Sequence, residues 1–265
     1  MTPEQILNHY DTATTWINQE ANADLTLPHA YNVAKALHDL RIERGESLVG
    51  IKIGLTNKLI WERLGIQEPM WGLVWDTTLF KIRGDQRPAS LTGLVCPKIE
   101  PEIAFRLNKR PPNNPSLEEL FCCIKTIAPA FELVQCHLDS WKFSPSQAIC
   151  DGGLHGQLWL GEEVELEHYF FSPTHAIETV GTAVVRLSEQ SGRSINGLGA
   201  NVMGNPFDSL ARLVSILYAF DNESFLTEDS IITTGSWTDA IPVDPGEKWS
   251  AKFSCFQDAI HLSFS

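Results

Sequence analysis

The stretch KIEPEIAFRL, residues 98–107, carries two acids inside a run that otherwise has the apolar pattern of a β-strand. Successive side chains of a strand point to opposite faces, so Glu100 and Glu102, two positions apart, project to the same side. Two carboxylates on one face repel each other unless a positive charge lies between them. The strand is therefore either exposed to water on that face or part of a site.

Two interpretations of this pair are open. Spacing alone favours two solvated glutamates on the exposed side of an edge strand, which Pro101 also fits because proline cannot donate to a sheet. The other is a divalent cation, since hard oxygen ligands from two or three carboxylates suit Mg²⁺ or Mn²⁺ better than zinc. A third acid would favour the ion. Glu132 is the candidate, because the run PAFELVQCHL (129–138) surrounds it with apolar residues, where an unpaired carboxylate is costly.

The chain on either side of this stretch changes character near residue 70. Before it, TPEQILNHYDTATTWINQE (2–20), with Thr2 as its candidate cap, and LPHAYNVAKALHDLRIERG (27–45) are predicted helices, and SLVGIKIGL (47–55) has the period of a strand. After it, short β-branched and aromatic runs recur between turn signals, interrupted by one clear helix at 206–220. The sequence predicts an α+β protein with a helical N-terminal segment (1–70) and a β-rich core (71–265).

Composition narrows the classes of partner. The chain has 265 residues, 43% of them hydrophobic, and a formal net charge of -13, which would repel a phosphate backbone, so nucleic acid is not expected. The first twenty residues lack the basic start and apolar run of a signal peptide, and no stretch is long enough to span a bilayer, so no membrane partner and a cytoplasmic location are expected. Six cysteines without a CxxC pair argue against a zinc knuckle or a redox motif.

Six motifs occur in order along the chain: GIKIGLTN (50–57), EPMWGLVWD (68–76), KIEPEIAFRL (98–107), FELVQCHLDSWKF (131–143), GNPFDSLARLV (204–214) and ITTGSWTDAIPVDPGEKW (232–249). Together they resemble the 2-oxopent-4-enoate hydratase and 4-oxalocrotonate decarboxylase family, within the fumarylacetoacetate hydrolase superfamily. The resemblance implies that residues 71–265 form a metal-binding catalytic core of mixed sheets, and that the protein is a homo-oligomer.

The resemblance also implies roles for particular residues. Glu100, Glu102 and Glu132 match the acids that bind Mg²⁺ or Mn²⁺ in the family, which favours the ion over solvated glutamates. Lys52 matches a family lysine, where a fixed cation could hold a substrate carboxylate or an enolate oxygen. The remaining candidates are two catalytic and four substrate-binding residues, namely Asp151 and His155, and Leu55, Trp71, Asp76 and Gln135.

The chain departs from the family's pattern after its fourth motif. Where the family commonly reads ADNASSG, this chain reads CDGGLHG (150–156), so Asp151 is kept while Leu154 and His155 replace a pair of serines. His155 is open to two interpretations, a replacement acid or base suited to neutral pH, or a loop residue bonded to the backbone. Where the family reads EIVDSR, Gln135 stands at an aspartate position and His137 at an arginine position.

A second departure lies in the EPMWGLVWD motif. Met70 and Trp71 stand where the family often has an aspartate and a phenylalanine, and Trp71 with Trp75 adds bulk near the expected pocket. This suggests an altered or more apolar substrate. The alternative is that the tryptophans belong to the core, where large aromatic residues more often lie.

The leading functional prediction is a metal-dependent lyase that acts on a short unsaturated 2-oxo or 2-hydroxy acid, by hydration in preference to decarboxylation. A 2-oxo acid chelates a divalent ion through its ketone and carboxylate oxygens, and both reactions share the dienolate that the ion stabilises. Hydrolysis of a carbon–carbon bond in an acylpyruvate is a second class, with His155 as the base that activates water. A repurposed binding protein without lyase activity is the third.

Overall fold

The computed structural model describes residues 1–84 and 87–265. Most of its strands belong to one large mixed sheet, with the order β2-β1-β10-β4-β5-β6-β3 and two short strands, β11 on β4 and β7 on β5. The pairs β1–β10 and β3–β6 are parallel and the other pairs are antiparallel. In chain order these strands are β1 (Leu48–Gly54), β2 (Met70–Trp75), β3 (Leu79–Lys81), β4 (Lys98–Leu107), β5 (Ile124–Val134), β6 (His155–Leu160), β7 (Val164–Glu165), β10 (Ile231–Thr233) and β11 (Ile241–Pro242).

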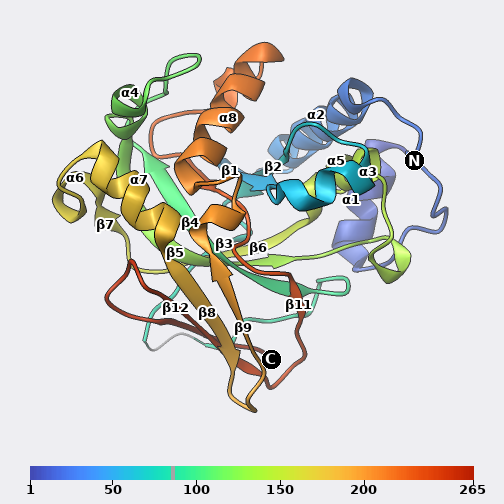
Figure 1. Cartoon of the computed structure of the whole chain (residues 1–265). Helices are drawn as coiled ribbons and strands as arrows, with labels where there is room; N and C mark the ends of the chain where they lie inside the picture. Colours follow the sequence, from blue (N-terminus) through green and yellow to red (C-terminus); the bar gives the residue numbers. More distant parts are fainter. Residues whose placement is uncertain (85–86) are drawn as a thin grey trace.

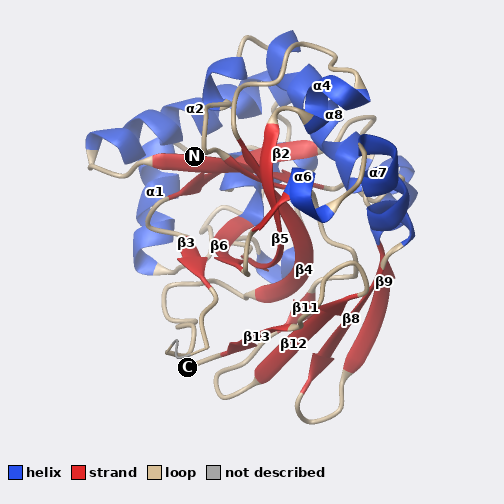
Figure 2. Ribbon diagram, turned by 90° about the vertical axis from the view of Figure 1, so that its left-hand side faces the viewer, coloured by secondary structure: helices blue, strands red, loops and turns tan. Residues whose placement is uncertain are grey.

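A smaller antiparallel sheet, ordered β13-β12-β8-β9, lies at the opposite end of the molecule from α4 and α8 (Figure 2). Its strands are β8 (Val184–Glu189), β9 (Ser194–Leu198), β12 (Lys248–Phe253) and β13 (Ile260–Ser263). The β-rich core of mixed sheets predicted from the sequence is therefore confirmed.

The helices gather in two groups on either side of the large sheet (Figure 1). One group is α1 (Pro3–Thr12), α2 (Leu27–Glu43), α3 (Trp61–Leu64) and α5 (Pro145–Cys150), and the other is α4 (Leu117–Phe121), α6 (Leu166–Tyr169), α7 (Pro173–Thr182) and α8 (Pro206–Ala219). The predicted helices at 27–45 and at 206–220 are confirmed, whereas the helix predicted over 2–20 ends at Thr12 and residues 13–20 are not helical. The cap is also confirmed, since the Thr2 hydroxyl accepts the Gln5 backbone N–H. Helices α4 to α7 were not predicted.

β4 is a central strand, so the edge position suggested by spacing alone is wrong. β5 pairs with β4 along its length, while β10 and β11 pair with its other side at 104–106 and at 98–99. Pro101 lies between these two stretches, where no ladder bond from its nitrogen is needed, and its carbonyl accepts the Trp237 N–H at 3.1 Å. Proline is tolerated here because β4 changes partners at this residue.

The boundary at residue 70 stays a prediction. Within the large sheet, β1 lies on the N-terminal side of that boundary and pairs with β2 and β10 on its C-terminal side.

All six cysteines are free, and Cys96 and Cys122 are exposed. In the described part of the chain, no helix has the length and apolar character that crossing a membrane requires.

Candidate metal centre

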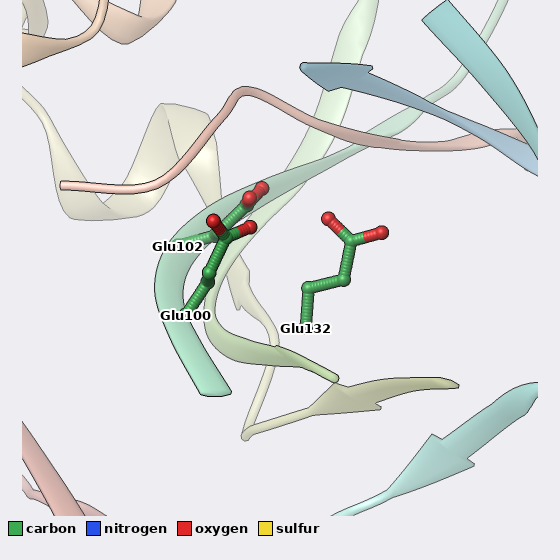
Figure 3. A group of neighbouring side chains, drawn as sticks. All are labelled: Glu100, Glu102 and Glu132. Atoms are coloured by element: carbon green, nitrogen blue, oxygen red, sulfur yellow. The ribbon is translucent and has the colours of Figure 1, made fainter. Parts of the chain in front are cut away.

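Three glutamates converge on one face of the large sheet (Figure 3). In the register of β4 and β5, Glu100 lies directly opposite Glu132, and Glu102 follows two positions along the same face. One carboxylate oxygen from each lies within 4.8 Å of the others. Like charges directly opposite each other destabilise a sheet, so this arrangement calls for a compensating cation.

Burial of these carboxylates increases the need for a compensating cation. The side chains of Glu102 and Glu132 are fully buried and Glu100 is half-buried. Glu102 Oε2 accepts the backbone N–H of Gly235 at 3.0 Å, but Glu102 Oε1 is buried without a hydrogen-bond partner. Burial, together with the charges of Glu132 and Glu100, raises the pKa of Glu102 well above its usual range. An orphaned carboxylate oxygen inside a set of three hard oxygen donors fits a divalent cation such as Mg²⁺.

Lys52 of β1 supplies a buried positive charge at the cluster. Its buried Nζ lies 3.2 Å from Glu132 Oε2 and donates a hydrogen bond to the Gly153 carbonyl at 3.0 Å. Although burial opposes ionisation of both groups, their attraction holds the pKa of Glu132 below and that of Lys52 above its usual value. When metal binding removes the protons from all three carboxyls, they and the ammonium leave two negative charges, which a doubly charged ion would neutralise.

The imidazole ring of His155 contacts the Glu132 carboxylate directly. Its Nδ1 is 2.8 Å from Glu132 Oε1, and its Nε2 is 2.9 Å from the Thr78 hydroxyl. Burial lowers the pKa of His155, which favours a neutral ring. Both ring nitrogens are thus engaged, and the imidazole fixes the orientation of a candidate metal ligand, as outer partners of metal sites commonly do.

Seven of the predicted site residues line one of two cavities. The first, the glutamate cavity of about 310 Å³, is lined in part by Lys52, Leu55, Glu100 and Glu102, and Glu132 lies beside them. The second, of about 220 Å³, is lined in part by Trp71, Gln135 and His155. The first cavity joins β1 and β4 to the end of β9 and to the loop between β10 and β11, so it depends on the tertiary fold.

Asp76 and Gln135 do not face the glutamate cavity. Asp76 is exposed at the end of β2, where its Oδ1 accepts the backbone N–H of Ser47 at 3.0 Å and of Thr77 at 2.9 Å. The Gln135 amide accepts the Val95 N–H and donates to the His155 carbonyl, each at 3.1 Å. Both side chains hold backbone in place, and their predicted substrate contacts stay predictions.

Asp151 lies outside the cavity as well. Its carboxylate accepts the His137 backbone N–H at 3.0 Å and lies 2.7 Å from His137 Nδ1, and both side chains are 0% exposed. The Tyr10 hydroxyl donates to the Asp151 carbonyl at 2.8 Å and fills the space that a side chain at Gly152 would need. Asp151 and His137 therefore form a buried pair beside the site, and the catalytic role predicted for Asp151 stays a prediction.

Some residues at the site were not predicted. Thr233 of β10 pairs with Lys52, is fully buried, and its hydroxyl has no hydrogen-bond partner. Leu154 and Trp141 line the glutamate cavity, and Thr78 holds His155. Thr233 lies in the ITTGSW motif, so that motif was the available signal. The other contacts join segments far apart in the chain and leave no local pattern.

The charge of the cluster predicts a pH-dependent affinity for metal. Burial, with the nearby charge of Glu132, raises the pKa of Glu100 from 4.5 to about 7. Because this carboxyl must lose its proton to bind a cation, Mg²⁺ affinity is expected to rise as the pH increases through that value. The metal-free protein should lose stability over the same rise, since the folded state binds the extra proton.

Thermal melts with and without Mg²⁺ check this expectation. The increase in melting temperature on adding Mg²⁺ is expected to be larger at about pH 8 than at about pH 5.5. An equal increase at the two pH values would contradict it.

No family model matches the sequence. It is 27% identical over 230 residues to a 2-hydroxyhexa-2,4-dienoate hydratase of Comamonas testosteroni, covering 85% of this chain and 82% of that protein. It is 26% identical over 237 residues to a 4-oxalocrotonate decarboxylase of Pseudomonas sp. (strain CF600), covering 87% and 83%.

The fold comparison agrees with the sequence comparison. The 4-oxalocrotonate decarboxylase from Pseudomonas putida G7, solved in complex with magnesium and adipate, superimposes with a TM-score of 0.85 at 25% identity, covering 99% of this chain and 95% of that one. A fumarylpyruvate hydrolase from Pseudomonas aeruginosa, at 11% identity and a TM-score of 0.57, shares the fold alone. The resemblance to the 2-oxopent-4-enoate hydratase and 4-oxalocrotonate decarboxylase family, predicted from six motifs, is thereby confirmed.

Proposed function

We propose that this protein is a divalent-metal-dependent lyase of the 2-keto-4-pentenoate hydratase type, which adds water to a short unsaturated 2-oxo acid. The observation that carries the proposal is the convergence of Glu100, Glu102 and Glu132 beside Lys52, at a cavity that Lys52, Glu100 and Glu102 line. Mg²⁺ or Mn²⁺ is the proposed ion, because the donors are all carboxylate oxygens. The similarity to hydratases and decarboxylases supports the same reaction class.

The residues around the cluster suit a 2-oxo acid. When bound, a divalent ion supplies Lewis acidity at the ketone and carboxylate oxygens of such an acid. Lys52 is held in place by Glu132 and by the Gly153 carbonyl, so its remaining N–H can hold a substrate carboxylate or a developing enolate oxygen without reorganisation. His155 fixes Glu132, and the burial of Lys52 keeps bulk water from its ammonium group.

Decarboxylation is the second candidate, because several relatives and the solved structure with TM-score 0.85 are named 4-oxalocrotonate decarboxylases. Such a substrate carries a second carboxylate. Among the described residues that line the glutamate cavity, Lys52 is the only one with a basic side chain. A second carboxylate would lack a cationic partner there, which favours hydration of a monocarboxylate.

A paired assay tests the proposal. With Mg²⁺ present, 2-hydroxypenta-2,4-dienoate is expected to lose its ultraviolet absorbance without release of carbon dioxide. Carbon dioxide released from 2-oxo-3-hexenedioate at a higher kcat/KM would instead assign the decarboxylase. No turnover of either substrate by the metal-loaded protein would contradict the lyase.

Lys52→Met tests the role of the ammonium group. The substitution keeps most of the length of the side chain and removes one charge, so turnover is expected to fall by roughly tenfold to a hundredfold while Mg²⁺ still binds. Lys58→Met, at a lysine outside the residues lining this cavity, is the matched control and should change neither quantity. Unchanged turnover in Lys52→Met would remove the proposed role.

A cytoplasmic location and a homo-oligomeric state are part of the proposal. Three large apolar side chains, Ile17, Leu59 and Phe171, are at least 90% exposed, and burying them would favour association. Light scattering of the purified protein tests the oligomer. A monomer at micromolar concentration would contradict it.

A further inference from the structure

We infer that the glutamate cavity selects a 2-oxo monocarboxylate with a bulky, uncharged, apolar tail, and that Leu55, Trp141 and Leu154 are its specificity-determining residues. The inference rests on the proposed function and extends the substrate beyond a five-carbon acid. Three separate features of the cavity support it: its strained apolar wall, its charges and its neighbouring apolar space.

The first feature is backbone strain at the apolar wall of the cavity, which Leu55, Trp141 and Leu154 form. Leu55, Trp141 and Leu154 have φ values of 57°, 56° and 63°, in the left-handed region that disfavours residues with a Cβ. All three line the glutamate cavity, although they come from three different connections of the chain. Glycine would relieve the strain at each position, and the large apolar side chains that stand there instead give this side of the cavity an apolar surface.

The second feature is the distribution of charge. Glu100, Glu102, Lys52 and Asp239 are the charged residues among the described ones that line the cavity, and only Lys52 is basic. Lys98 lies nearby, but its Nζ rests 4.0 Å from the centroid of the Trp141 ring and it is not a lining residue. A second carboxylate on the substrate would meet acidic, neutral polar and apolar groups, with no second cation among the described lining residues to pair with it. An uncharged tail would meet apolar groups without that penalty.

The third feature is the space beyond the wall. Leu55 and Met70 line the glutamate cavity and also a third cavity of about 210 Å³. That third cavity is mainly apolar, with Tyr31, Ile66 and Ile216 among its lining residues. Its one basic lining residue among the described ones, Arg212, is paired with Glu68. Met70 stands where the resemblance leads one to expect an aspartate, so the wall that the two cavities share is apolar in this chain. A long apolar tail that reaches this wall meets apolar side chains.

Binding of 2-oxo acids to the Mg²⁺-loaded protein, followed by calorimetry, tests the inference without relying on turnover. 2-Oxohexanoate and phenylpyruvate are expected to bind about tenfold or more tightly than pyruvate, because each buries additional apolar surface. 2-Oxoadipate has the length of 2-oxohexanoate and differs from it by a terminal carboxylate. It is expected to bind at least about tenfold more weakly than 2-oxohexanoate.

Two variants test whether the apolar wall binds the tail of the ligand. Leu55→Ala and Leu154→Ala are each expected to weaken 2-oxohexanoate binding about tenfold while leaving pyruvate binding unchanged. Met203→Ala is the matched control, because Met203 also has a left-handed φ of 53° and is half-buried but does not line the glutamate cavity. Thermal melts identify any loss of folding. Leu55 is only half-buried, so its variant is expected to stay folded.

The outcomes separate the inference from the function on which it rests. If pyruvate and oxalate bind with Mg²⁺ but 2-oxohexanoate shows no advantage over pyruvate or over 2-oxoadipate, the inference is overturned and the lyase stands. If neither pyruvate nor oxalate binds the Mg²⁺-loaded protein, both are overturned. Weakening of pyruvate and 2-oxohexanoate to the same extent in Leu55→Ala would also overturn the role of the wall.

Discussion

Replacement of Glu102 by glutamine is expected to abolish binding of divalent metal at micromolar concentration and to lower turnover at least about a hundredfold. Glutamine keeps the shape of the side chain and its bond from the Gly235 N–H, but it removes one of the charges that a cation would neutralise. Manganese titration by calorimetry and steady-state kinetics measure the two effects. Glu228→Gln, at an exposed glutamate, is the matched control.

Stability distinguishes this loss from misfolding. Glu102 is buried beside two other carboxylates, so the metal-free Glu102→Gln protein should melt at or above the temperature of the metal-free parent. Addition of Mg²⁺ should then stabilise the parent and leave the variant unchanged. A variant that binds Mn²⁺ as tightly as the parent would show that Glu102 is not a ligand.

The largest effect on folding is expected from His137→Ala, which should lower the free energy of unfolding by about 3–5 kcal/mol. The substitution leaves the Asp151 carboxylate fully buried without its imidazole partner at 2.7 Å, and it also opens a cavity beside Tyr10. Urea unfolding followed by tryptophan fluorescence measures the change.

A double-mutant cycle isolates the His137–Asp151 pair. Once His137 is alanine, replacing Asp151 by asparagine should cost much less than it does in the parent, because the unpaired charge is then removed. Equal costs in the two backgrounds would show that the two residues do not interact. Turnover of the Asp151→Asn protein, at a temperature where it is folded, then measures whether Asp151 has the catalytic role predicted from the resemblance.

Local sequence patterns were sufficient to predict much of the candidate site. The two-residue period of a strand placed Glu100 and Glu102 on one face, and apolar neighbours correctly indicated that Glu132 is buried. The strands β1, β4 and β5 were predicted from alternation and β-branched residues, and the first helix from its Thr2 cap. These features depend on residues close in sequence, where steric and hydrogen-bonding preferences act directly.

The wrong and missing predictions concern places where segments far apart in the sequence meet in the fold. β4 was first assigned to an edge because a local proline signal cannot show that β4 changes partners at Pro101. Likewise, no residue close to Asp151 in the sequence indicates that His137 contacts the Asp151 carboxylate. Nor does the local sequence indicate that Tyr10, about 140 residues earlier, fills the space at Gly152. Short helices such as α5 lack enough residues to show a period. Tertiary pairing, rather than local preference, decides each of these cases.

The most direct test of the metal centre is anomalous scattering from crystals of the protein soaked in Mn²⁺ and oxalate. One strong manganese peak is expected between the carboxylates of Glu100, Glu102 and Glu132, with oxalate bound on the side of Lys52. Crystals that show no peak there under saturating Mn²⁺, with the three side chains unchanged, would contradict the account.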